Sequence, residues 1–177
     1  SRGTQEFRYG IFEMRAKIDV RQGSWPAFWT LGVSGEWPSN GEIDIMEAVG
    51  EPDWMSMAAH GSSYSGEAAL VNKKYFSAPD SIAEWHVYSL ECSPTCLSFF
   101  VDDELAYRIT RPMVEFFGPW AFDTEKFLIL NLALGGTYPF KTNGIRQPYY
   151  GLPTLTVRKI QNNKALFVVD WVKITQL

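Results

Sequence analysis

Alternation of polar and apolar side chains with a period of two is the feature that most constrains this chain. In the segment YGIFEMRAKIDV, residues 9–20, the even positions from Phe12 to Val20 are apolar and the odd positions are mostly charged. Successive side chains of a β-strand point to opposite faces of the sheet. The pattern therefore predicts a half-buried antiparallel strand.

Short segments of the same kind recur along the chain, with clusters of Pro, Gly, Asn and Ser between them. They are SWPAFWTLGV (24–33), EIDIMEAV (42–49), SMAAHGSS (56–63), EWHVYSLEC (84–92), LSFFVDDELAYRI (97–109), KFLILNLALGG (126–136) and KALFVVDWVKITQL (164–177). Only MVEFFG, residues 113–118, hints at a helical turn. Many short strands predict an all-β fold, a sandwich or a barrel. The length of 177 residues, without internal repeat or linker, predicts a single domain spanning residues 1–177.

Charge and hydropathy exclude two classes of partner. The net charge is −4 and no long basic run is present, which argues against a nucleic-acid partner. No apolar run approaches the roughly 20 residues that a membrane-spanning helix needs, so no membrane partner is expected. Aromatic residues make up 15% of the chain. They suit the flat apolar faces of sugars, although most of them are expected to fill a core.

The two cysteines, Cys92 and Cys96, stand in ECSPTC. Their spacing lacks the further Cys or His residues of a closed zinc site. Two interpretations stay open: a small disulfide across the intervening turn, or two apolar residues at strand ends. A bridge that closes so short a loop would stabilise the fold only modestly.

The segment GEIDIMEAVG, residues 41–50, places three acids in an apolar strand. Glu42 and Asp44 share one face of a regular strand, whereas Glu47 points to the other face. Buried acids cost several kcal/mol each unless they are paired or solvated, so three on one strand need an explanation. One extra residue bulged around 45–46 would bring all three acids to the same face.

Such a group of acids has a chemical use in glycoside hydrolysis. Two carboxyl groups about 5 to 5.5 Å apart serve a retaining mechanism, with one as nucleophile and the other as proton donor. Asp44 between Glu42 and Glu47 would raise the proton affinity of its neighbours by like-charge repulsion. A cation site and a solvated acidic face are the alternatives.

Several sequence blocks together resemble the laminarinase-like branch of glycoside hydrolase family 16, the endo-β-1,3-glucanases. The blocks follow the family's order through nearly the whole chain and are YGIFEMRAKI, GSWPAFWTLG, WPSNGEIDIMEAVG, EWHVYSLECSPTCLSFFVDD, LILNLALGG and VVDWVKITQL. The resemblance implies a β-jelly-roll sandwich with a cleft on its concave sheet and a β-glucan as substrate. It implies no cofactor for catalysis, Glu42 as nucleophile, Glu47 as acid/base and Asp44 as an assisting carboxylate.

The resemblance also implies residues that contact the sugar. Trp29 and Trp37 match positions near the donor subsites, whereas Trp25 matches such a position or belongs to the core. His60 matches a histidine close to the acid/base, with a buried structural histidine as the alternative. Asn131 lies on a strand expected to floor the cleft, where a structural role is slightly favoured over substrate binding.

Two further expectations come from the resemblance. Asp170 in VVDWV resembles an aspartate that helps to hold a structural calcium ion on the convex side, although one oxygen ligand does not make a site that needs six to eight. Cys92 stands where the family often has tryptophan, so a Cys92–Cys96 disulfide is expected to substitute for that packing. A disulfide and a polymeric substrate both favour a secreted, extracellular protein.

Family members usually carry further strands before the YGIFEMRAKI block. A fragment that stays associated with a complementary N-terminal part of the same domain is favoured over a permuted or an abbreviated domain. An abbreviated sandwich would expose strand edges, which promotes aggregation.

Other functions on this scaffold stay open. Hydrolysis of agarose, carrageenan or a β-galactan is the nearest alternative, but residues 21–61 offer only Arg21 to a sulfated chain. A non-catalytic β-glucan-binding domain would typically lack the two glutamates that this sequence keeps. An unrelated lectin-like sandwich would not explain the order of the blocks.

Overall fold

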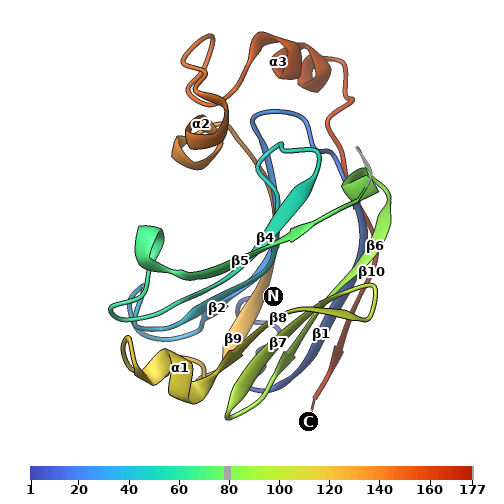
Figure 1. Cartoon of the computed structure of the whole chain (residues 1–177). Helices are drawn as coiled ribbons and strands as arrows, with labels where there is room; N and C mark the ends of the chain where they lie inside the picture. Colours follow the sequence, from blue (N-terminus) through green and yellow to red (C-terminus); the bar gives the residue numbers. More distant parts are fainter. Residues whose placement is uncertain (78–80, 177) are drawn as a thin grey trace.

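The computed structural model describes residues 1–77 and 81–176, which form two five-stranded antiparallel sheets packed face to face (Figure 1). The first sheet has the strand order β5-β4-β3-β2-β9 and the second has the order β10-β1-β6-β7-β8. This architecture confirms the predicted all-β sandwich. Every neighbouring pair is antiparallel.

The strands of the first sheet are β2 (Ser24–Gly32), β3 (Glu42–Glu47), β4 (Trp54–His60), β5 (Leu70–Tyr75) and β9 (Lys126–Leu134). Those of the second sheet are β1 (Gly10–Ile18), β6 (Trp85–Cys92), β7 (Cys96–Val101), β8 (Glu104–Thr110) and β10 (Phe167–Thr175). The helical segments are η1 (Gly66–Ala68), η2 (Ser81–Ala83), α1 (Arg111–Glu115), α2 (Thr137–Asn143) and α3 (Thr154–Gln161). No helix among the described residues is long and apolar enough to cross a membrane.

The core lies between the two sheets and follows the predicted alternation. In β1 the apolar side chains at even positions, from Phe12 to Ile18, are buried, and the residues between them are partly exposed. Phe28 of β2 and Phe99 of β7 are fully buried on the inner faces of the opposing sheets. The inner face of each strand is thus committed to the core, and the outer face of the first sheet is free to carry a site.

The helices α2 and α3 were not predicted, and α1 overlaps MVEFFG only in residues 113–115. Both α2 and α3 lie together beyond one end of the sandwich (Figure 1). A seven-residue helix such as α2 is too short to show a periodic pattern. It ends at Gly144, whose φ of 66° is the left-handed conformation that glycine adopts at helix ends.

Strands β9 and β10 are the edges of their sheets, and both lie on the same side of the sandwich. A hollow of about 810 Å³ opens between them, lined by the N-terminal residues and by apolar side chains that include Leu130 and Val172. Leu130, Leu134 and Trp171 are more than a third exposed. One side of the sandwich therefore presents the outer edges of β9 and β10 with apolar side chains. Among the described residues only the start of β9 is bonded there, Lys126 by Phe7 and Leu128 by Ser1.

The disulfide prediction was wrong, because both cysteines are free thiols in the structure. Cys92 pairs with Leu97 across the β6–β7 hairpin, and both side chains point into the core. Cys96 precedes Leu97 and so points to the opposite face of the sheet. Its Sγ lies 3.4 Å from Ser98 Oγ, whereas Cys92 Sγ donates to the Arg8 carbonyl oxygen at 3.8 Å.

The two thiols should react at different rates with a thiol reagent such as Ellman's reagent. Cys96 should react first, because Cys92 is buried and burial raises its pKa to about 12. Cys96→Ser should remove the fast phase, and Cys92→Ser should leave it in place. When the protein is unfolded without reductant, both cysteines should react with the reagent. If neither cysteine reacts after unfolding, a disulfide has formed between them.

Candidate active site

Strand β3 carries a β-bulge between Asp44 and Glu47. Trp29 of β2 pairs with Asp44 and Phe28 pairs with Met46, so Ile45 has no partner on β2. The register against β4 shifts at the same place. Ile45 and Met46 are consecutive, and both are buried in the core. The predicted bulge around 45–46 is confirmed.

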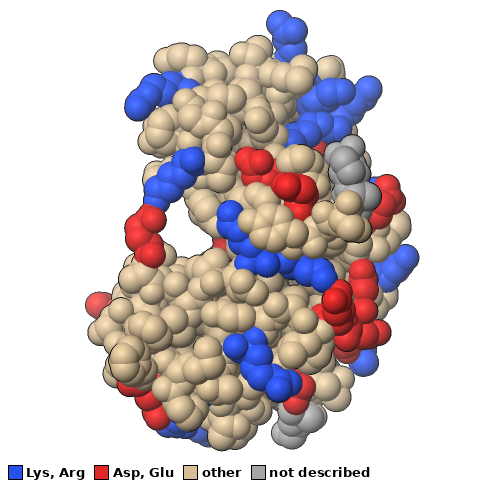
Figure 2. All heavy atoms as spheres, viewed as in Figure 1, with Lys and Arg blue, Asp and Glu red and all other residues tan. Residues whose placement is uncertain are grey.

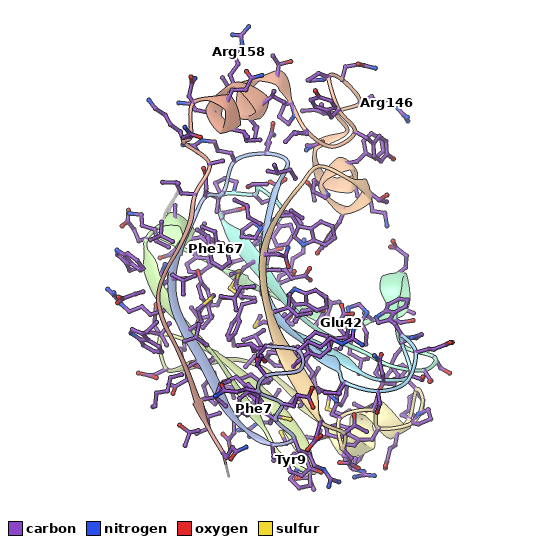
Figure 3. All side chains as sticks on the ribbon, turned by 180° about the vertical axis from the view of Figure 1, so that it is seen from behind. Phe7, Tyr9, Glu42, Arg146, Arg158 and Phe167 are labelled. Carbon is purple, nitrogen blue, oxygen red and sulfur yellow. The ribbon has the colours of Figure 1, made fainter. Side chains whose placement is uncertain are left out.

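The bulge brings the three acids to one face of the sheet. On that face β4 places His60 opposite Glu42, Ala58 opposite Asp44 and Ser56 opposite Glu47. Two adjoining hollows share all three acids and Trp25. One, of about 370 Å³, extends over β4 and β5, and the other, of about 220 Å³, extends over β2 and β9. The acids therefore lie in the middle of a cleft that runs across the strands. Figure 3 shows Glu42 on the side of the first sheet that faces away from the second sheet.

Asp44 is the buried member of the three acids, with 2% of its surface exposed. Burial, the charge of Glu42 and a hydrogen bond with Glu42 raise its pKa well above the ordinary value. The raised pKa makes Asp44 the member of the pair that holds a proton and donates it toward the Glu42 carboxylate. A carboxylate that accepts such a bond is held in place and carries the charge of the pair.

His60 contacts the acids from β4. Its Nε2 lies 2.9 Å from Asp44 Oδ2 and 3.9 Å from Glu42 Oε1, although the first contact lacks the alignment of a hydrogen bond. Its Nδ1 accepts a hydrogen bond of 3.2 Å from the Gly66 N–H. In the neutral ring the proton therefore resides on Nε2 and faces the acids.

This tautomer bears on the alternative of a cation site. Glu42, Asp44 and His60 have ligand atoms within 4.8 Å of one another and are the one such group among the described residues. A metal ion at this site would need the lone pair of His60 Nε2. The Nδ1 lone pair accepts the hydrogen bond from the Gly66 N–H, so the proton of the neutral ring is on Nε2 and no lone pair is available there. The arrangement suits the sharing of protons better than the binding of a metal.

Glu47 has the properties of a general acid. Burial, followed by the charge of Asp44, raises its pKa to about 8. The Trp25 indole Nε1–H donates to Glu47 Oε1 at 2.9 Å, which opposes that rise and fixes the position of the carboxyl group. Glu47 thus carries a proton near neutral pH and is aimed into the cleft.

The structure brings most of the predicted sugar-contacting residues to this cleft. Trp25 lines both hollows and is not part of the core, so its core interpretation was wrong and its contact with sugar stays a prediction. Trp29 Nε1–H donates to Asn131 Oδ1 at 2.7 Å, so Asn131 orients an aromatic side chain on the cleft floor. Trp37 is 51% exposed, and its ring centroid lies 6.2 Å from that of His60.

Sequence reasoning missed three polar side chains that line the cleft: Tyr138 and Lys141 on α2, and Glu67 on η1. The Tyr138 ring packs edge-on against Trp25 with centroids 5.3 Å apart, and its hydroxyl lies 3.4 Å from Ser56 Oγ. No sequence signal pointed to them, because they stand in short helical segments whose place over the sheet depends on the tertiary fold.

Asp170 lies apart from this cleft, on β10 of the other sheet. Its Oδ2 pairs with Arg15 Nη1 at 2.5 Å. The predicted calcium ion stays a prediction, and no step of the chemistry depends on it.

Known proteins resemble this chain in sequence and in structure. The model of the family described as glycosyl hydrolases family 16 matches residues 1–136. A β-glucanase from Rhodothermus marinus is 37% identical over 149 residues, which is 78% of this chain and 52% of that protein. A β-1,3-glucan-binding protein from Penaeus monodon is 31% identical over 93% of this chain and 53% of its own length. The chain thus spans about half the length of these relatives.

A solved structure shows the same fold. The laminarinase catalytic domain from Thermotoga maritima MSB8 superposes with a TM-score of 0.82 and 30% identity. The superposition covers 99% of this chain and 67% of that domain.

The raised pKa of Glu47 predicts how stability depends on pH. From about pH 4.5 to 8 the folded protein keeps a proton that an unfolded Glu47 releases, so the free energy of unfolding should fall as pH rises. This proton contributes a slope of about 1.4 kcal/mol per pH unit, and Asp44 adds a slope of the same sign. Urea denaturation across this range should show a shallower slope for Glu47→Gln.

Glu84→Gln is the control for that measurement, because the Glu84 side chain is 68% exposed and pairs with Lys17 on β1 of the second sheet. It should leave the slope unchanged. An unchanged slope in Glu47→Gln would show that Glu47 titrates normally and is not held protonated.

Proposed function

Because the chain belongs to glycosyl hydrolases family 16, we propose that it is a retaining, endo-acting glycoside hydrolase that cleaves β-1,3-glucosidic bonds in laminarin-like or mixed-linkage β-glucans. The observation that carries the proposal is the bulge in β3, which places a protonated Glu47 beside the Asp44–Glu42 pair in one cleft. The named activities of the Rhodothermus and Thermotoga relatives support the choice of substrate.

The roles of the three acids follow from their environments. In the first step the Glu42 carboxylate attacks the anomeric carbon, while Glu47 gives its proton to the departing glycosidic oxygen. In the second step Glu47 takes a proton from water, and the resulting hydroxide displaces Glu42 from the sugar. Asp44 orients Glu42 through their shared hydrogen bond, and the substrate keeps its anomeric configuration overall.

Aromatic and small residues shape the cleft for sugar rings. Trp25 and Trp29 line its floor, and Trp37 stands exposed at its edge. Ala27 and Ala58 flank β3 and leave room above the acids. Because a glucan polymer does not enter cells, we propose that the protein acts outside the cell.

A non-catalytic β-glucan-binding function is the second candidate. It is favoured by the similarity to the glucan-binding protein from Penaeus monodon. Both candidates predict affinity for glucan, and only hydrolysis requires Glu42 and Glu47.

We also propose that a complementary strand segment of the same protein covers the side that β9 and β10 leave open. The described residues leave most of these two edges unpaired, with exposed apolar side chains beside them, and such edges favour the addition of strands. The Thermotoga domain supports this, because 33% of it (100% minus 67%) has no counterpart in this chain.

Hydrolysis is tested by reducing-sugar release from laminarin and lichenan. Glu47→Gln should lower activity on these polymers by about 10²–10⁴-fold, because proton donation is lost. The loss should be smaller on an aryl glucoside with a good leaving group. Glu42→Gln should lose activity on all substrates alike while it still binds glucan. NMR of the first product should show a retained anomer.

An inverted product would exclude Glu42 as the nucleophile. Wild-type protein that binds laminarin without releasing reducing sugar would establish the binding function in its place.

The open side is tested by sedimentation of the chain 1–177. It should self-associate and bind the dye ANS, and Leu130→Lys should reduce both effects. Leu155→Lys on α3 is the control, because Leu155 is 68% exposed and lies outside the edge. A monomer that binds no ANS would contradict the proposal.

A further inference from the structure

The larger hollow of the cleft is spanned by an ion pair. Glu67 on η1 and Lys141 on α2 both line this hollow, and their charged groups are in contact. The segment η1 follows β4, whereas α2 follows β9 at the far edge of the sheet. Figure 2 shows a basic and an acidic side chain meeting at the left of the molecule, above an opening, between the positions of α2 and η1 in Figure 1.

We propose that Glu67 and Lys141 form a clasp over the cleft that determines how a glucan chain enters it. The proposal rests on the proposed function and concerns the same site. With the clasp closed, the larger hollow is a passage that a short oligosaccharide can enter by its end. An internal segment of a long polymer can reach the acids only while the clasp is open.

The clasp is weak enough to open. The Glu67 side chain is 83% exposed and that of Lys141 is 48% exposed. Exposed ion pairs favour the closed form by at most about fivefold, and salt screens them. If only the open form binds a polymer, the apparent affinity for the polymer is reduced in proportion to the fraction of protein that is open. The clasp should therefore lower the affinity for polymers and leave the affinity for short oligosaccharides unchanged.

The clasp also stands beside the catalytic groups. Gly66, next to Glu67, donates to His60 Nδ1, and Tyr138, on the same helix as Lys141, packs against Trp25. The two ends of the clasp thus belong to segments that hold the partners of Asp44 and Glu47. The ion pair and the three acids thus line the same hollow.

The test compares kcat/KM on laminarin with kcat/KM on a short β-1,3-gluco-oligosaccharide. Glu67→Gln and Lys141→Gln should each raise the polymer-to-oligosaccharide ratio by about two- to fivefold. The double variant Glu67→Lys/Lys141→Glu should return the ratio toward that of wild type. Added salt should raise the ratio in wild type and leave it unchanged in the single variants.

Lys17→Gln is the matched control, because Lys17 forms a 2.9 Å pair with Glu84 of similar exposure, 41% and 68%, away from the cleft. This variant should leave the ratio unchanged. Equal changes on polymer and oligosaccharide, or the same change in Lys17→Gln, would overturn the clasp.

Failure of the proposed function is distinguished by a binding measurement. If wild type hydrolyses neither substrate, the hydrolase proposal fails, and the clasp is judged from the rate of laminarin association followed by tryptophan fluorescence. A faster association in Glu67→Gln would support the clasp. An unchanged or undetectable association would overturn it.

Discussion

The free-energy cost of burying three carboxyl groups on one strand is the constraint on which the rest of this structure depends. A regular β3 would send Glu47 into the core, where an acid without a partner costs several kcal/mol. The bulge turns Met46 into the core beside Ile45 and returns Glu47 to the cleft. One inserted residue thus keeps the core apolar and brings Glu47 to the same face as Glu42 and Asp44.

The position of β3 in its sheet makes the bulge useful. As the central strand it has neighbours on both sides, which supply Trp29 and Ala27 from β2 and His60 and Ala58 from β4. Their side chains surround the acids with aromatic, small and proton-bearing groups. Burial among these groups raises the pKa of Glu47 and of Asp44. Glu47 is thereby protonated, and Asp44 shares a hydrogen bond with Glu42.

Local sequence was a good guide wherever burial alternates along a strand. The alternation around Phe12 predicted β1, and the spacing of Glu42 and Glu47 predicted the bulge, because both follow from the period of two. The disulfide prediction was wrong because closeness in sequence does not place two side chains on the same face. Cys92 and Cys96 point to opposite faces of the sheet. Family resemblance added the roles of the acids, which spacing alone left open.

By itself, the sequence determined the all-β class, the three acids and the aromatic residues near them, because strand periodicity and the cost of buried charge are local properties. The tertiary structure decided which groups tune those acids. Trp25 reaches Glu47, and the Gly66 N–H sets the tautomer of His60, only because strands and loops distant in sequence converge on one face. The closure of the cleft by Glu67 and Lys141 was likewise decided by packing, because η1 and α2 meet only in the folded chain.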